Sequence, residues 1–295
     1  MDAASSTTAA LVLVAVTLFA ATVNGALGYG FSSLTVPIAV LFYANRVLNP
    51  ALVLVEVGVN SYSLFINRRA VPNVWKRTLP IVGGLVPGVI VGSVLLSTLN
   101  AGSIKALTYV VLLPLILLQA AGLRRPIAAE RAVGVPLGAG IGLLYAVTTI
   151  SGPPLALMLN NQGFARRDFR ASLAIVRIAE SSLTAVAYAF LGLYTVQTLS
   201  LLGLIVPSVL IGVPLGVFLI RRLAAETFRR VCMSFDVWVV GFGLSRALID
   251  LGLVGDPLGY VVLACAGLLD LTLLYQFFRR QRAGEVGFDV AIATH

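Results

Sequence analysis

The chain has 295 residues, of which 59% are hydrophobic and only 11% are Asp, Glu, Lys or Arg, with a formal net charge of +9. In soluble domains about a quarter of all residues are charged. This composition therefore excludes an ordinary soluble protein and predicts an all-α integral membrane protein. The positive charge does not indicate nucleic-acid binding, because the basic residues stand in short clusters between apolar runs.

Apolar stretches of about 20 residues, long enough to cross a bilayer core, follow one another along the chain. In chain order the predicted spans are residues 9–27, 50–67, 78–99, 103–122, 131–148, 170–192, 196–220, 228–248 and 255–278. Two shorter apolar pieces, residues 32–44 and 151–161, follow the first and fifth spans after interruptions rich in Gly, Ser and Thr. At about 1.5 Å per residue they are too short to cross, so each is expected to turn back as a hairpin.

The basic residues predict the orientation of the chain in the membrane. If the C-terminal end is cytoplasmic, most of the 21 Lys and Arg residues fall on that side, as the positive-inside rule requires. The cytoplasmic segments are then residues 68–77, 124–131, 166–170, 221–230 and 279–282. We therefore predict a multi-pass protein with its N-terminus outside and its C-terminus in the cytoplasm.

Matching motifs in the two halves predict an internal repeat. Residues 25–37 (GALGYGFSSLTVP) and 142–154 (GLLYAVTTISGPP) have Gly and Pro at the same separation, and a slightly larger offset pairs Glu56 with Glu180. The loop at 67–78 holds four basic residues, whereas its counterpart at 191–197 holds none. Because the charge bias changes sides between the copies, the copies are expected to be inserted in opposite orientations.

The predicted architecture is one transmembrane domain over residues 1–295. It comprises two inverted-topology repeats, at 9–123 and 131–250, each with a broken-helix hairpin and three spanning helices. Residues 255–278 form an extra C-terminal helix. Glycines that recur every four residues indicate close helix packing; they are Gly84, Gly88, Gly92, Gly134, Gly138, Gly142, Gly212 and Gly216.

The two Gly-to-Pro motifs, each following an apolar helix, and the later G-x-x-x-G in each half resemble the TauE/SafE family of sulfite exporters and sulfonate permeases. The resemblance covers about residues 10–250. It implies a secondary active transporter of small anions in the cytoplasmic membrane of a prokaryote. The implied substrates are sulfur oxyanions or organosulfonates, such as sulfite, sulfoacetate or taurine-like compounds.

Helices that begin in mid-membrane present free backbone N–H groups and the positive end of the helix dipole, which suits an anion. Both short pieces begin in this way, at corresponding positions of the two halves, which is the usual pointer to a transport site. The predicted substrate-binding residues are Gly30, Ser32, Ser33 and Thr35 in the first and Thr148, Thr149, Ser151 and Gly152 in the second. The alternative is that these are hinge glycines and capping hydroxyls without a ligand.

Charged residues inside the spans are costly and are therefore functional candidates. Glu56 and Glu180 are each followed four residues later by a polar residue on the same helix face, Asn60 or Thr184. These four are predicted to couple or gate transport, and Arg177, one turn before Glu180, to contact the anion. The alternative is a structural Arg177–Glu180 pair, with Glu56 capped or snorkelling near the outer end of its helix.

Other residues argue against an enzyme, a metal or a cofactor. The single histidine is His295, and Cys232 and Cys265 lie in apolar segments. Asp236 and Asp270, which have no counterparts in the other half, are predicted to be interfacial or structural. A passive anion channel and a carboxylate transporter of the same fold stay open as alternatives. The expected partners are a small anion and the lipid bilayer; a coupling proton or cation and a homodimer are further options.

Overall fold

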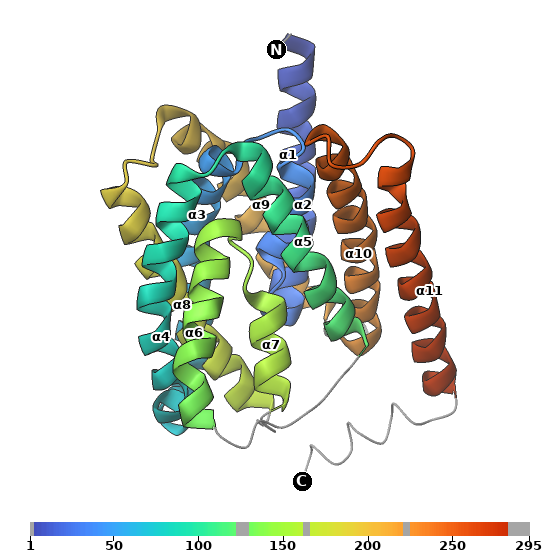
Figure 1. The fold of residues 1–295 in the computed structure, drawn as a ribbon. Coiled ribbons are helices and arrows are strands. Elements are labelled where there is room, and N and C mark those ends of the chain that lie inside the picture. Colours follow the sequence, from blue (N-terminus) through green and yellow to red (C-terminus); the bar gives the residue numbers. More distant parts are fainter. Residues whose placement is uncertain (1–2, 122–129, 162–165, 221–224, 283–295) are drawn as a thin grey trace.

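The computed structural model describes residues 3–121, 130–161, 166–220 and 225–282, and these are almost entirely α-helical (Figure 1). No strand occurs among them. Within the described ranges, seven helical segments are long and apolar enough to cross a membrane. The protein is therefore an all-α multi-pass membrane protein, as its composition predicts. The basic residues expected in the loops at 124–129 and 221–224, and His295, lie outside the described residues.

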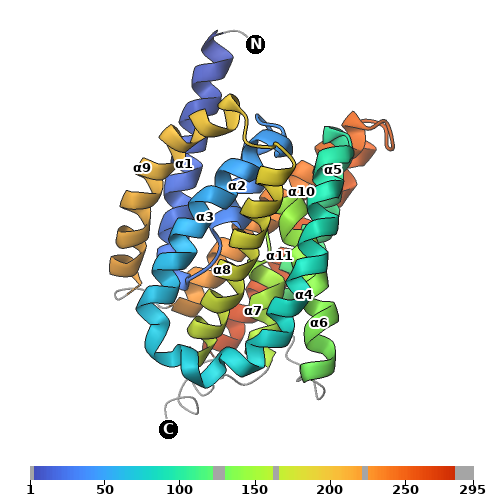
Figure 2. The same ribbon diagram turned by 90° about the vertical axis from the view of Figure 1, so that its left-hand side faces the viewer.

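The helices run up and down through one bundle (Figures 1 and 2). The first five are α1 (Ala3–Leu27), α2 (Phe31–Ala39), α3 (Asn45–Asn67), α4 (Val71–Thr98) and α5 (Ala101–Ala120). They are followed by α6 (Glu130–Thr148), α7 (Gly152–Asn161), α8 (Arg166–Phe190), α9 (Val196–Leu219), α10 (Ala225–Asp250) and α11 (Val261–Arg282). Short 3-10 turns, η1 (Arg68–Ala70) and η2 (Leu258–Tyr260), precede α4 and α11.

Several helices do not begin where they were predicted to: α1, α3, α4 and α8 begin four to seven residues earlier, and α11 begins six residues later. The span predicted at 50–67 begins at Asn45, and the span predicted at 78–99 begins at Val71. Both starts are rich in polar residues, which hydropathy scores as loop. The start of α4 also has a proline, which the first turn of a helix accepts. The fifth predicted span is α6, whose apolar part, Val133–Thr148, is shorter than the spanning helices.

The two short apolar pieces form the short helices α2 and α7. In each case a break of three residues, 28–30 or 149–151, separates the short helix from the long helix before it. α1 descends from the top of Figure 1 and α2 turns back upwards, whereas α6 rises from the bottom and α7 turns back downwards. The hairpins therefore enter the bundle from opposite ends. This is the arrangement that inverted repeats require, although the repeat itself remains a prediction.

Several basic segments lie at one end of the bundle. The η1 turn with the start of α4, the start of α8 and the end of α11 are all at the bottom of Figure 1. These segments carry Arg68, Arg69, Lys76, Arg77, Arg167 and Arg279. Their common position agrees with the one-sided charge distribution, and the assignment of that end to the cytoplasm remains a prediction.

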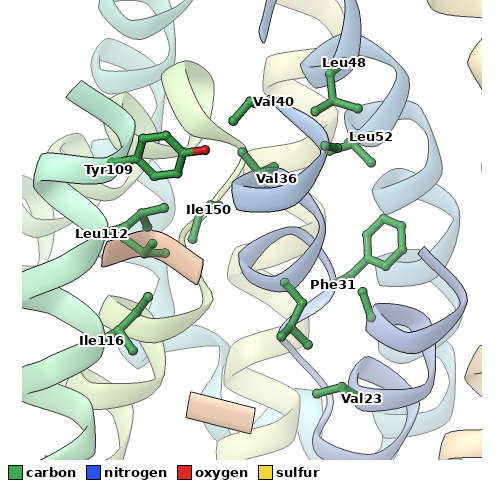
Figure 3. Packing of buried hydrophobic residues seen from close by; sticks show 14 of the residues in the cluster. Val23, Phe31, Val36, Val40, Leu48, Leu52, Tyr109, Leu112, Ile116 and Ile150 are labelled. Carbon is green, nitrogen blue, oxygen red and sulfur yellow. The ribbon is translucent and has the colours of Figure 1, made fainter. Parts of the chain in front are cut away.

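The short helix α2 is enclosed by the core of the protein. Eight of its nine residues are buried. Its apolar side chains pack against α1, α3 and α5 (Figure 3), with contributions from Val23, Phe31, Val36, Val40, Leu48, Leu52, Leu112 and Ile116. The hydroxyl of Tyr109 on α5 donates to the carbonyl oxygen of Pro37 at 2.7 Å, which satisfies an acceptor near the C-terminal end of α2. The buried side chains and this hydrogen bond together hold α2, including its N-terminus, inside the bundle.

Two pairs of helices touch through their backbones at glycines. A Cβ atom on Gly88 of α4 would lie 2.0 Å from the carbonyl oxygen of Ala139 on α6. A Cβ atom on Gly216 of α9 would lie 1.9 Å from the carbonyl oxygen of Thr22 on α1. These contacts confirm the packing role predicted for the four-residue glycine spacing. Each pair joins a helix of the first predicted repeat to one of the second.

Replacing Gly88 by alanine is expected to destabilise the α4–α6 pair by about 1–3 kcal/mol, because the added methyl group requires the backbones to separate. Gly83→Ala is the matched control, since it lies on the same helix and a Cβ atom there meets nothing within 4 Å. The temperature of thermal unfolding in detergent should therefore be lower for Gly88→Ala and unchanged for Gly83→Ala. Equal stability of the two variants would show that the close α4–α6 contact is wrong.

Candidate functional site

Three buried ionisable side chains lie at the middle of the bundle. Glu56 is midway along α3, and Arg177 and Glu180 are near the middle of α8. Their exposed fractions are 1%, 4% and 0%. Charges are expensive in this environment unless they are paired and hydrogen-bonded, so their partners decide what the cluster can do.

The Glu56 carboxylate accepts hydrogen bonds from three other helices. Ser32 Oγ on α2 donates to Oε1 at 2.8 Å, and Tyr145 OH on α6 donates to Oε2 at 2.6 Å. Arg177 Nη2 on α8 donates to Oε1 at 2.8 Å and completes a buried ion pair. Glu56 is thus neither capped nor snorkelling near the end of its helix, and that alternative is wrong.

Glu180 has fewer partners than Glu56. Ser151, in the break before α7, donates a hydrogen bond to Glu180 Oε1. The same oxygen lies 4.0 Å from Arg177 Nε, which is an ion pair without a hydrogen bond. Glu180 Oε2 and Arg177 Nε are both buried and have no hydrogen-bond partner in the described part of the chain. The expected Arg177–Glu180 pair therefore exists, but the closer contact of Arg177 is with Glu56.

Both helix breaks are shaped by unusual backbone conformations. Gly28 and Gly30 have φ values of 86° and 106°, in the left-handed region that glycine adopts readily. In the second break Thr149 has a φ of 58° although it is not glycine. Its hydroxyl donates to the Thr148 carbonyl at 2.7 Å, and the Thr148 hydroxyl accepts from the Ile150 N–H at 3.1 Å. These two hydroxyls stabilise the break locally.

Ser33 has a similarly local role. Its hydroxyl donates to the carbonyl oxygen of Gly30 at 3.1 Å. Gly30, in turn, caps α2 without any side-chain hydrogen bond. For Ser33, Thr148 and Thr149, the contacts are those of the capping alternative, whereas Ser32 and Ser151 reach the glutamates.

The Arg177 guanidinium lies against the start of α7. A Cβ atom on Gly152 would be 3.7 Å from Arg177 Nη1 and 3.4 Å from Cδ2 of Tyr29, a residue of the first break. The two breaks therefore approach each other beside Arg177. A guanidinium next to a helix N-terminus provides two positive groups for a small anion.

Asn60 contacts the cluster, and Thr184 and Thr35 each lie about one helical turn after one of its residues, Glu180 and Ser32. Asn60 Nδ2 donates to the Arg177 carbonyl at 3.2 Å and to Ser181 Oγ at 3.3 Å, so it links α3 to α8. Thr184 Oγ1 and Thr35 Oγ1 are buried, and neither has a hydrogen-bond partner among the residues described. The structure thus leaves two hydroxyls near the cluster with unused hydrogen-bonding capacity.

Tyr145 was not predicted as a site residue. An aromatic residue in an apolar run is ordinarily a core residue, so its identity alone carries little information. One feature of the sequence could have indicated it: Tyr145 lies four residues before Thr149 in the motif at 142–154. Residues four apart share one face of a helix, so Tyr145 is on the same face as the start of the break.

A second buried ion pair lies away from the breaks, between α10 and α11. Arg230 Nη2 donates to Asp270 Oδ1 at 2.9 Å, and Ser234 Oγ donates to Asp270 Oδ2. Asp270 is therefore held in a buried ion pair, and the interfacial or structural role expected for it stays a prediction. Asp236 is also buried, on α10.

The protein thus has a buried polar cluster beside the breaks of two hairpins, an arrangement that occurs in membrane transporters. The family model for the sulfite exporter TauE/SafE family matches residues 13–242. The chain belongs to this family of transporters, as the motif resemblance predicts. No curated protein and no solved structure matches it.

Proposed function

We propose that this protein is a secondary active transporter of small anions, with sulfur oxyanions or organosulfonates as substrates. The observation that carries the proposal is the position of Arg177, which is buried with its Nη1 beside the start of α7 and with its Nε lacking a hydrogen-bond partner among the described residues. The site residues are Gly30, Ser32, Thr35, Ser151, Gly152 and Arg177, with Glu56, Asn60, Glu180 and Thr184 coupling or gating. Helix N-termini and a guanidinium together bind oxyanions without a metal.

The burial of the cluster favours a carrier over a passive channel. Glu56, Arg177 and Glu180 are almost fully enclosed, whereas an open pore would expose the charges along its wall. The opposite entry of the two hairpins supports alternating access between halves at 9–123 and 131–250. We assign the protein to a prokaryotic cytoplasmic membrane, with the basic end of the bundle in the cytoplasm.

Counterflow in proteoliposomes tests this function. Vesicles loaded with unlabelled sulfite should accumulate external labelled sulfite transiently, with a rate that saturates as the concentration rises. The same assay with sulfoacetate, taurine and acetate ranks the substrate classes. Conductive flux that follows voltage without saturation or counterflow would identify a channel instead.

Ser151→Ala is expected to weaken sulfite binding by about tenfold, because it removes the hydroxyl that bridges the second break and Glu180. Ser97→Ala is the matched control, since the Ser97 hydroxyl is exposed and donates to the Val94 carbonyl oxygen of its own helix. Affinity can be measured by calorimetry on protein that passes a thermal-unfolding check. An unchanged affinity for Ser151→Ala would show that the second break does not contribute to sulfite binding.

A further inference from the structure

We infer that the Glu56 carboxylate occupies, in this structure, the place that the transported anion takes on binding. Arg177, Tyr145 and Ser32, which now hold Glu56, are then the groups that hold the oxygens of the substrate. This inference rests on the function proposed above and assigns its substrate ligands, including one residue, Tyr145, outside the predicted site.

Three hydrogen-bond donors converge on Glu56. A guanidinium and two hydroxyls, from α8, α6 and α2, donate to the two carboxylate oxygens at 2.6–2.8 Å. A carboxylate, a sulfite and a sulfonate all present negatively charged oxygens that accept such bonds. The three donors therefore form a complete oxyanion site that the protein fills with its own side chain.

The buried cluster around Glu56 holds one guanidinium and two carboxylates. The charged or titratable groups that face Glu56 are Tyr145 of α6 and Arg177 and Glu180 of α8. The neighbouring helices α2 and α9 have no ionisable residue. On α5, the hydroxyl of Tyr109 donates to the carbonyl oxygen of Pro37. The charged residues of α4, Lys76 and Arg77, lie near the start of that helix. One guanidinium already serves two carboxylates, so a further anion requires one carboxylate to leave and to bind a proton.

The Glu56–Arg177 ion pair joins α3 to α8. Glu56 belongs to the first predicted repeat and Arg177 to the second, so their ion pair connects the two halves. An anion that replaces Glu56 on Arg177 breaks this connection. Binding of the substrate then also breaks the contact between the two halves. The substrate therefore binds the conformation in which this contact is broken more tightly than the one in which it is formed, and alternating access requires such a difference.

Glu56→Gln tests the inference, because it preserves the size of the side chain and removes the competing charge. Purified Glu56→Gln should bind sulfite and methanesulfonate about tenfold more tightly than the wild type, by calorimetry. Adding Tyr145→Phe to this variant should lower the affinity again. Asp250→Asn controls for net charge, since Asp250 is 53% exposed and forms a surface ion pair with Arg246. Equal or weaker binding by Glu56→Gln would overturn the inference.

The wild-type protein provides a second test if Glu56→Gln does not fold. Methanesulfonate does not titrate near neutral pH, so a proton taken up during its binding is bound by the protein and not by the ligand. Binding heats in two buffers of different ionisation enthalpy should reveal such uptake, and its absence would contradict the displacement of Glu56. Failure of wild type and variant alike to bind either anion would reject the proposed function itself, whereas binding by the wild type without these effects rejects only this inference.

Discussion

Replacing Arg177 by glutamine is expected to reduce sulfite transport by about a hundredfold or more. The substitution removes the guanidinium, and a charge-assisted hydrogen bond to an oxyanion accounts for a loss of this size. It also leaves Glu56 and Glu180 without their common cation, which costs about 3–5 kcal/mol when one partner of a buried pair is removed. Initial uptake rates in proteoliposomes, with thermal unfolding of the same preparations, measure both effects.

Arg246→Gln is the matched control for this experiment. Arg246 pairs with Asp250 at 3.9 Å, but their side chains are 45% and 53% exposed, and such surface pairs contribute only about 0–1 kcal/mol. Arg177→Lys should recover part of the activity, since one ammonium group supplies the charge but not the fork that reaches two carboxylates. Normal transport by folded Arg177→Gln would mean that the anion binds elsewhere.

Replacing Glu180 by glutamine is expected to uncouple transport from a proton gradient. Glu180 Oε2 is buried without a hydrogen-bond partner in the described residues, and glutamine permanently resembles the protonated form of this side chain. The variant should therefore exchange substrate in counterflow but no longer accumulate it when a pH gradient is imposed. The measurement compares accumulation with and without the gradient.

Asp250→Asn, which removes an exposed carboxylate, should accumulate substrate as the wild type does. If Glu180→Gln still concentrates substrate on a proton gradient, Glu180 does not carry the coupling proton. Loss of counterflow as well as accumulation would instead assign Glu180 to substrate binding or folding.

The local features of the fold were predictable from the sequence. Breaks rich in Gly, Ser and Thr mark where α1 and α6 end, since glycine accepts the backbone conformations at Gly28 and Gly30. The lengths of the following apolar pieces predict α2 and α7 as half-length helices. The glycine spacing on α4, α6 and α9 predicts close packing. Each of these signals is contained within one segment.

The partners of these segments were not predictable, because they depend on tertiary structure. Glycine spacing shows that a helix is approached closely, but not that α4 meets α6 or that α1 meets α9. Helical spacing pairs Arg177 with Glu180, three residues away, whereas the closer partner is Glu56, far away in the sequence. Tyr145 acquires its role only because α6 ends opposite Glu56. A single sequence holds no record of such distant contacts.

The central claim is that the buried cluster around Arg177 binds a small oxyanion, and an affinity screen on the purified protein tests it most directly. The set should comprise sulfite, thiosulfate, sulfate, sulfoacetate, taurine and simple carboxylates, with folded Arg177→Gln measured beside the wild type. We predict saturable binding of sulfur oxyanions or organosulfonates that compete for one site, and its loss in Arg177→Gln. Binding of none of these anions by folded wild-type protein, or equal binding without Arg177, would contradict the account.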